Sequence, residues 1–308
     1  MERIKIISYN VDGLPAQLDL AQLPWVLRPF TWLYKMVKGT TLVTVNDNDN
    51  LEWKADAIGR WLAEQEADIV AVQEDFAYHD LMIGPMTDGY RFGTYTGGFE
   101  LSRLFAVTEW MTRFPLPRFL ADGLNIFTRK KTVEVHHETI VRWRKSYGYI
   151  SHANDLLVHK GFRHYLLTVG DCSIDLYVVH MDADFYNRNS DVSGDVEARR
   201  AQFRQLADYI RERLTSRSER PVIIVGDTNS MAGNEWDNSA DVLIERVGSV
   251  AAVHEAVPVN YTDVDRLFYI NNPASEYVLS VLSCRYDKSV RWSDHYPLIV
   301  EMEAARRE

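Results

Sequence analysis

The chain contains little of what a disulfide-stabilised or membrane-spanning protein needs. Of its 308 residues only two are cysteine, and Cys172 and Cys284 show neither metal-ligand spacing nor a disulfide framework. Both lie in apolar, strand-like segments, so we expect buried free thiols. No uninterrupted apolar stretch reaches the length of about twenty residues that a transmembrane helix requires. These absences argue against a small disulfide scaffold and against a helical membrane protein.

A recognisable targeting segment is also missing. No signal or transit peptide pattern precedes the first predicted strand, which begins at Arg3. We expect a cytoplasmic location if Met1 is the natural start, and a secreted or periplasmic location if a signal peptide has been removed.

Positive charge is scarce. The chain carries 34 Lys and Arg against 44 Asp and Glu, which gives a formal net charge of −10, and no long Lys/Arg run is present. Non-specific binding of nucleic acid depends on basic side chains that neutralise phosphates. The balance therefore disfavours DNA or RNA as a partner, although a local basic groove on an acidic protein stays an alternative.

Internal repeats and linkers rich in Pro, Gly or Ser are absent as well. Hydrophobic residues make up 46% of the chain and aromatic residues 12%, which is enough for a substantial core. The length fits one large α/β domain or two smaller ones.

The chain lacks a Gly-x-Ser-x-Gly nucleophile elbow and a convincing Cys/His pair. Attack by an activated water is therefore the simpler chemistry. What the chain has instead is a set of polar motifs, three of which directly follow the apolar runs Ile4–Ile7, Ile69–Val72 and Val222–Val225. The motifs are Ser8-Tyr9-Asn10-Val11-Asp12-Gly13-Leu14, Val72-Gln73-Glu74, Gly226-Asp227-Thr228-Asn229 and Ser293-Asp294-His295.

These residue types suit a metal ion and a phosphate ester. Mg²⁺ prefers oxygen ligands and keeps several waters, so one or two carboxylates can hold it. Glu74 is the best candidate for direct ligation, assisted by Asn10 or Asp12. Histidines beside a phosphate can stabilise charge or transfer protons, and the candidates are His180 and His295.

The third motif offers groups for the attacking water. Asp227 can accept a proton from that water, and the amide of Asn229 can position the water or a phosphate oxygen. An ordinary Asx turn is the structural alternative for this pair.

The order of the motifs resembles the endonuclease/exonuclease/phosphatase superfamily, with its DNase I-like fold, from about Lys5 to Glu301. The resemblance implies one catalytic domain over residues 1–308, with long insertions at about 15–50 and 84–123. It also implies a metal-dependent phosphoric ester hydrolase that uses Mg²⁺, with Mn²⁺ as the alternative. The implied site residues are Asn10, Asp12, Glu74 and Asp294 at the metal, and His180, Asp227, Asn229, Asp265 and His295 in catalysis, with Asp265 oriented toward His295.

Within the superfamily, the middle of the chain looks like the neutral sphingomyelinase-like branch. The segments that carry this likeness are Ala121-Asp122-Gly123-Leu124, Lys160-Gly161-Phe162-Arg163, His180-Met181-Asp182-Ala183 and Arg199-x-x-Gln202. Lys160 and Arg163, like Asn229 and His180, are candidates for substrate contact, and a charge pair at a strand end is the alternative for the first two. Asp182 could serve the site or hold its loop through backbone hydrogen bonds.

The substrate hypothesis follows from both observations. A sphingomyelin-like lipid or another small phosphodiester comes first, and the choice between monoester and diester stays open. A DNA-directed endonuclease or exonuclease of the abasic-site type is the runner-up, because the first motif, Asn-Val-Asp-Gly-Leu, resembles that group. A catalytically silent binding module is the third alternative, but no expected metal or histidine position is lost.

Strands and helices alternate along the chain. Predicted helices cover Trp53–Glu66 and Val196–Ser216. This pattern predicts two sheets packed face to face with helices outside, and the resemblance implies the same four-layered α/β sandwich with two mainly antiparallel sheets. The predicted strands are Arg3–Ser8, Ile69–Gln73, Leu124–Phe127, Thr132–Thr139, His164–Thr168, Ser173–Val179, Val222–Val225, Arg266–Tyr269, Tyr277–Leu282 and Leu298–Met302.

Two long segments, Pro15–Asn50 and Gly84–Gly123, interrupt the pattern and are rich in aromatic residues. Segments of this length are usually functional or disordered. We expect both to fold down as short helices that bury their rings. Substrate-binding walls, or a rim in peripheral contact with a membrane, are the alternatives. We expect a monomer, and we interpret the remaining histidines, including His164, mostly as surface residues without metal spacing.

Overall fold

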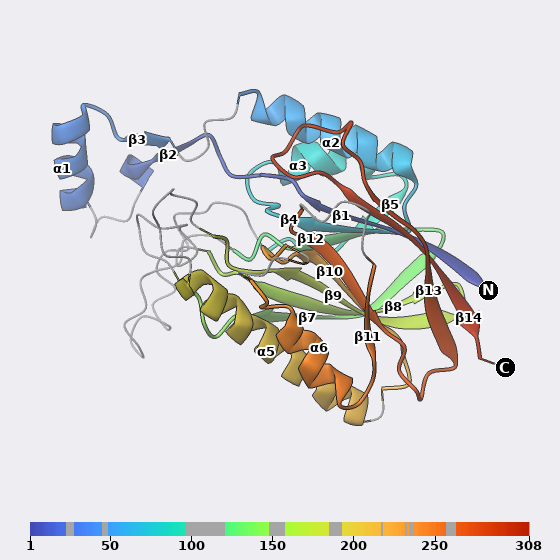
Figure 1. Cartoon of the computed structure of the whole chain (residues 1–308). Coiled ribbons are helices and arrows are strands. Elements are labelled where there is room, and N and C mark those ends of the chain that lie inside the picture. The colour runs from blue at the N-terminus through green and yellow to red at the C-terminus, as the bar shows by residue number, and fades with distance from the viewer. Residues whose placement is uncertain are drawn as a thin grey trace.

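Two six-stranded β-sheets form the centre of the molecule (Figure 1). The structure is a computed structural model, and it describes residues 1–22, 28–44, 49–96, 121–147, 158–184, 193–216, 218–231, 233, 237–256 and 263–307. Each sheet has one parallel pair of strands at its centre, β1 with β4 in the first and β9 with β10 in the second. All the other strand pairs within the two sheets are antiparallel.

The first sheet has the order β13-β14-β1-β4-β6-β5. Buried β1 and β4 lie near its middle, and they read as almost continuous apolar runs because both of their faces are covered. The strands are β1 (Glu2–Asn10), β4 (Ile69–Gln73), β5 (Tyr90–Phe92), β6 (Asn125–Arg129), β13 (Tyr277–Tyr286) and β14 (Leu298–Arg306).

The second sheet has the order β11-β12-β10-β9-β8-β7. Its edge strand β7 alternates a few inward residues with many exposed ones, as an edge strand with one solvated face should. The strands are β7 (Val133–Arg142), β8 (Gly161–Val169), β9 (Cys172–His180), β10 (Val222–Asp227), β11 (Val253–Ala256) and β12 (Asp265–Ile270).

Helices cover the outer face of each sheet and complete four layers. α2 (Leu51–Gln65) and α3 (His79–Ile83) pack on the first sheet through a cluster that includes Ile58, Leu62 and Val70. α5 (Ser193–Thr215) and α6 (Asp241–Gly248) cover the second sheet through a separate cluster. The remaining short elements are β2 (Gln17–Asp19), η1 (Leu20–Gln22), α1 (Arg28–Lys38), β3 (Leu42–Thr44) and η3 (Gly84–Met86).

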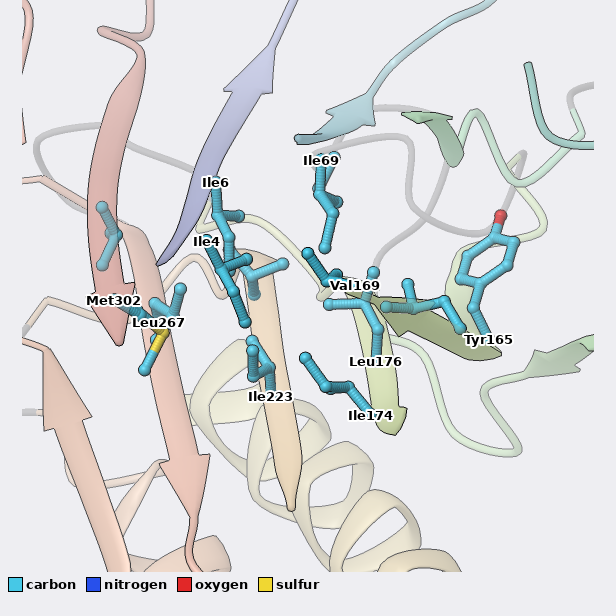
Figure 2. Close-up of a cluster of buried hydrophobic side chains, with 14 of the residues drawn as sticks. Ile4, Ile6, Ile69, Tyr165, Val169, Ile174, Leu176, Ile223, Leu267 and Met302 are labelled. Carbon is cyan, nitrogen blue, oxygen red and sulfur yellow. The ribbon is translucent and has the colours of Figure 1, made fainter. Parts of the chain in front are cut away.

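The main core lies between the two sheets (Figure 2). Ile4, Ile6 and Ile69 project from the first sheet against Leu176 and Ile223 of the second, and each is at most 1% exposed. Complete burial of one such side chain contributes roughly 1.5–3 kcal/mol. This shared core fixes the position of one sheet on the other, which matters for the site described below.

The predicted fold class is confirmed, and every strand and helix predicted from the sequence is present. Ile69–Gln73 has the predicted bounds, whereas most other strands extend one to three residues further. The short elements inside the two long segments, together with α6 and β11, were not predicted individually.

The expectation that the long segments bury their rings is wrong for α1. Trp32 is 63% exposed and Leu33 is 56% exposed, so this helix turns apolar side chains outward. In the second segment Tyr90 is buried. Residues 97–120, which hold most of the other aromatic side chains of that segment, lie outside the described residues.

Smaller expectations are settled too. Both cysteines are free, and Cys172 is buried whereas Cys284 is half-buried. His164 is not a surface residue, because it is 6% exposed and its Nε2 lies 2.7 Å from Asp175 Oδ1. Within the described ranges, no helix combines the length and the hydropathy needed to cross a membrane.

Candidate active site

The two central parallel pairs end at the same edge of the two packed sheets. Asn10 is the last residue of β1, and Glu74 follows the last residue of β4 directly. In the second sheet Asp227 pairs in register with His180 on one side and with Asp265 on the other. The topology therefore brings Asn10 next to Asp227, which lies 217 positions away in the sequence.

Asn10 joins the two sheets at this edge. Its Nδ2 lies 3.1 Å from Glu74 Oε1 and 3.0 Å from Asp227 Oδ2. Its Oδ1 accepts a hydrogen bond from the backbone N–H of Asp12 at 3.1 Å. A carboxylate can only accept, so this network assigns the amide nitrogen to the side that faces Glu74 and Asp227. In this geometry Asn10 organises the two carboxylates, whereas the sequence suggested a metal ligand.

His295 and Asp265 form a close pair, as the resemblance implied. His295 Nδ1 lies 2.6 Å from Asp265 Oδ2, and His295 Nε2 lies 3.8 Å from Asp227 Oδ2. The backbone of Asp265 is held by the hydroxyl of Tyr286, which donates to its carbonyl oxygen at 2.5 Å. Sequence reasoning missed Tyr286, because nothing near it in the chain marks it.

The loop that carries His295 is tied to the first motif. Ser293 donates from Oγ to the backbone oxygen of Asn10 at 2.7 Å and accepts the backbone N–H of His295 at 3.1 Å. One hydroxyl thus connects the last motif of the chain to the first. Asp294 is exposed beside this serine, and its Oδ1 is 3.2 Å from Ser293 Oγ.

His180 lies across the site from His295. Its Nε2 is 3.5 Å from Asp227 Oδ2 and 3.9 Å from Glu74 Oε1. The indole N–H of Trp143 donates to the His180 backbone oxygen at 2.7 Å, and the side chain is only 1% exposed. Together these contacts place both predicted histidines around the same oxygen of Asp227.

The backbone oxygen of Met181 is a second meeting point. It accepts a hydrogen bond from Asn229 Nδ2 at 2.9 Å and from Lys160 Nζ at 3.1 Å. Asn229 also donates its backbone N–H to Asp227 Oδ1 at 2.9 Å, which leaves Oδ2 to face the histidines. Lys160 is 5% exposed, and its positive charge acts on Glu74.

Burial shifts the pKa values of the acidic groups and of the histidines in the site. It raises the pKa of Glu74 to about 7, against the opposing charge of Lys160. Burial likewise raises the pKa of Asp265 to about 6. The pKa of His180 is held well below its usual range by burial and by the positive charge of Lys160.

His295 behaves in the opposite way. Burial lowers its pKa, but the Asp265 and Asp227 carboxylates outweigh this and raise the pKa well above its usual range. The pKa values of the two histidines around Asp227 are therefore shifted in opposite directions, which is the division that acid–base chemistry uses.

Several site residues have strained backbones. Asp12, Glu74 and Asn229 have φ angles of 48°, 59° and 49°, in the left-handed region that non-glycine residues rarely occupy. Three of the five such residues among those described are thus predicted site residues. Strain of this kind persists only where the surrounding structure enforces it, and it clusters at functional sites.

Two glycines allow the close approach of the motif segments. A Cβ at Gly13 would lie 2.2 Å from the backbone oxygen of Glu74. Gly226 has a φ of 142°, and a Cβ there would lie 2.2 Å from the backbone oxygen of Val179. Both positions exclude any larger residue without a shift of the backbone.

The structure does not bring Arg163 into the site. Its guanidinium is fully buried and pairs with Asp122 at 2.6 Å and with Glu138 at 2.9 Å. All three guanidinium nitrogens donate hydrogen bonds inside the protein. The ion-pair alternative explains this residue better than substrate contact does.

The other middle motifs also support the site from behind. Gln202 donates to Asp182 Oδ1 at 2.7 Å and accepts the Asp182 backbone N–H at 3.1 Å. Arg199 donates to the Asp182 backbone oxygen at 3.0 Å. These bonds anchor the chain directly after His180 and Met181, so Asp182 holds the loop.

The donor set can be tested against a metal ion. Within the described part of the chain, no three Asp, Glu, His or Cys side chains converge as a ready-made metal cluster. Glu74 instead presents one half-buried carboxylate whose charge is opposed by desolvation and by nearby Asp294. One carboxylate with water-filled remaining positions suits Mg²⁺ better than it suits Zn²⁺ or Ca²⁺. Asp12 is half-buried and lines the same pocket as Glu74, so it offers a further oxygen donor.

Comparison with known sequences decides the family. The sequence profile of the Endonuclease/Exonuclease/phosphatase family matches residues 7–243, which includes most of the site described above. The chain belongs to this family. It is accordingly a hydrolase of the phosphodiesterase type. Among curated protein sequences, no significant match to the chain is found.

Solved structures resemble this member of the endonuclease/exonuclease/phosphatase family over nearly its whole length. SmcL covers 98% of this chain and 99% of its own, with 14% identity and a TM-score of 0.62. A magnesium-bound double mutant of beta toxin from Staphylococcus aureus covers 97% and 99%, with 15% identity and a TM-score of 0.60. D. rerio TDP2 with a single-strand DNA product covers 98% and 99%, with 16% identity and a TM-score of 0.58. At these identities the likeness establishes the shared fold.

Proposed function

We propose that this protein is a Mg²⁺-dependent phosphodiesterase that hydrolyses a lipid or another small phosphodiester by direct attack of water. The observation that carries the proposal is the position of Asp227 Oδ2, which lies 3.0 Å from Asn10 Nδ2, 3.5 Å from His180 Nε2 and 3.8 Å from His295 Nε2. One carboxylate oxygen between an amide and two imidazoles fits a general base whose neighbours bind an anion.

Residues of the chain have distinct roles in this reaction. Glu74 would hold the metal, with Asp12 or Asp294 as further oxygen donors, and the bound ion would supply Lewis-acid polarisation of a phosphate oxygen. Asp227 Oδ2 accepts the proton of the attacking water. His295, kept protonated by its acidic neighbours, donates to a phosphate oxygen or to the leaving group.

The remaining polar groups orient these participants. Asn10 keeps Glu74 and Asp227 at a fixed separation through its amide, and Asp265 fixes the ring of His295. His180, with its proton on Nε2, can donate to the phosphate without carrying a charge. Magnesium bound to the beta toxin mutant of the same fold supports the choice of ion.

The substrate class rests on separate arguments. The middle motifs resemble the sphingomyelinase-like branch, and Gln202, Arg199 and Lys160 from these motifs anchor the loop that follows His180. The net charge of −10 favours a substrate other than a nucleic acid polymer. A DNA-directed activity is the second candidate, because D. rerio TDP2 of the same fold holds a single-strand DNA product.

The test is hydrolysis by purified protein, with Mg²⁺ and with a chelator, of three substrates: sphingomyelin in mixed micelles, bis-p-nitrophenyl phosphate and a duplex with an abasic site. Glu74→Gln and His295→Ala should abolish turnover, whereas the matched exposed-residue variants Glu64→Gln and His136→Ala should retain it. Lipid turnover that follows this pattern supports the proposal. Cleavage of the abasic duplex without lipid turnover would show that the substrate is DNA and not a lipid. A Glu74→Gln variant as active as wild type would overturn the assignment of the site.

A further inference from the structure

Helix α1 projects from the insertion that follows the first site motif. It lies with the small β2–β3 sheet beyond the end of the two large sheets, and β1 runs from the N-terminus toward that same side (Figure 1). Asn10, at the end of β1, is therefore on the side of the molecule that carries α1. Thr31 anchors the helix, because it is buried and donates from Oγ1 to the backbone oxygen of Leu20 at 3.0 Å.

The outer face of α1 is apolar. Trp32, Leu33, Met36 and Val37 are 63%, 56%, 64% and 73% exposed. At 3.6 residues per turn these positions form one continuous stripe, with its centre roughly 170° around the helix from anchored Thr31. The stripe therefore lies on the side of the helix opposite the bond that holds Thr31 to Leu20. Contiguous exposed apolar surface of this kind marks an interaction site.

The charge around the stripe indicates which kind of partner it contacts. The segment from Leu20 to Asn46 contains Arg28, Lys35 and Lys38 and no acidic residue, although the whole chain carries 44 acidic side chains and a net charge of −10. The two lysines are exposed, and at about 100° per residue they lie on the side of the helix away from the centre of the stripe. A helix with an apolar face, a tryptophan and basic residues on its polar face has the composition of helices that lie in the interface of anionic lipid.

We propose that α1 is a docking helix that holds the protein on an anionic lipid surface, with Trp32, Leu33, Met36 and Val37 inserted at the level of the headgroups. A second copy of this chain suits the surface less well. In a two-fold contact through α1 each copy would meet the same helix, which carries basic residues and no acidic residue to complement them. The docking inference rests on the helix surface alone and holds whether or not the substrate is a lipid.

The experiment measures binding of the full-length protein to vesicles by co-sedimentation, in chelator so that no metal-dependent turnover contributes. One set of vesicles contains phosphatidylserine in phosphatidylcholine, and the other contains phosphatidylcholine alone. Trp32→Gln/Met36→Gln removes part of the stripe, and Lys35→Gln/Lys38→Gln removes the charge. Ile244→Gln, at an exposed position of helix α6, is the matched control for the loss of an exposed apolar residue.

Wild type and Ile244→Gln should bind the anionic vesicles. The Trp32/Met36 variant should bind about tenfold more weakly or worse, and the lysine variant should lose about fivefold for each charge removed. Both variants should hydrolyse soluble bis-p-nitrophenyl phosphate at the wild-type rate if the proposed chemistry is right, so failure of docking and failure of that chemistry give different results.

Two results would overturn the inference. The first is wild-type protein that stays in solution with both kinds of vesicle, or a Trp32/Met36 variant that binds as tightly as wild type. The second is a concentration-dependent dimer in sedimentation velocity that the same variant abolishes, since the stripe would then serve a second copy of the chain.

Discussion

The amide of Asn10 donates to the carboxylate of Asp227 across 3.0 Å, and this bond connects the ends of two different sheets. Because Asn10 ends β1 and Asp227 ends β10, the distance between them depends on how the sheets pack on their shared core. The same amide reaches Glu74 at 3.1 Å. The geometry of the site therefore depends on how the two sheets pack against each other.

Asn10→Ala tests this relationship. Without the amide, the two carboxylates lose their shared donor and repel each other, so we expect turnover to fall roughly 10–100-fold, as it does when groups that orient metal ligands are removed. The measurement is the Mg²⁺ dependence of bis-p-nitrophenyl phosphate hydrolysis. Asn10→Asp should be worse than Asn10→Ala, because it adds a third carboxylate, and the reverse order would contradict the donor role.

Metal binding by Glu74 has a readout that does not require activity. If Mg²⁺ binds only the folded protein, an ion concentration of ten times Kd stabilises the wild type by about 1.4 kcal/mol, which corresponds to a rise in Tm of roughly 2 °C. Glu74→Gln should show no rise. Its Tm without Mg²⁺ should be at least that of wild type, because the neutral amide avoids burial of a charge. A Mg²⁺-dependent rise in Tm that persists in Glu74→Gln would show that the metal binds elsewhere.

Asp265 and His295 should act as one unit. Asp265→Asn removes the charge that keeps His295 protonated, and we expect kcat to fall about 10²-fold or more, with little change in KM. The double variant with His295→Ala should be no slower than His295→Ala alone, since the aspartate would act through the histidine. Tyr286→Phe is the matched milder change, because it removes only the bond to the Asp265 carbonyl. Losses that multiply in the double variant would mean that Asp265 acts independently of His295.

Much of this arrangement could be predicted from the sequence. The positions of Asn10, Glu74 and Asp227 at the site could be predicted, because polar residues that directly follow an apolar run mark the end of a buried strand. The pairing of Asp265 with His295 came from the family resemblance. Local pattern could not supply the orientation of the Asn10 amide, which depends on the backbone N–H of Asp12.

Other features depended on contacts that are distant in the chain. Arg163 looked like a substrate contact because its partner Asp122 lies 41 residues away. The apolar residues of α1 looked like core, since periodicity gives the face of a helix but not what lies opposite that face. Tyr286 has no marker at all in the sequence. For these residues, only the tertiary structure shows the role of the side chain.

Arg163 should be a structural residue. Arg163→Met leaves Asp122 buried without its partner, so we expect the free energy of unfolding to fall by about 3–5 kcal/mol. Adding Asp122→Leu should recover part of the loss, because it removes the buried carboxylate that lost its partner, whereas Glu138 also loses its arginine but is only half-buried. Urea denaturation measures both effects. The double variant should retain its turnover per folded molecule. A double variant that is fully stable but inactive would show that Arg163 contributes to the active site.

Asp175 provides a pH-dependent test remote from the site. Its carboxylate is 1% exposed, and it accepts hydrogen bonds from Ser218 Oγ at 2.8 Å and from Arg220 Nε at 3.0 Å, with His164 Nε2 at 2.7 Å. Burial raises the pKa of Asp175, but these partners outweigh burial and lower the pKa below its ordinary value. The folded state therefore binds a proton less readily at this group than the unfolded state does.

The sign of the effect follows from that difference. The stabilisation is fully present above the unfolded pKa of about 3.9, and it is lost as the pH falls from there through the lower folded pKa. Asp175→Asn should cost about 2 kcal/mol at neutral pH, in line with hydrogen bonds to a charged group. The difference from wild type should shrink in acid, which urea unfolding at a series of pH values measures. A cost that stays constant down to the acid end would show that Asp175 stabilises the fold by shape alone, because only the charged form accepts all three of these partners.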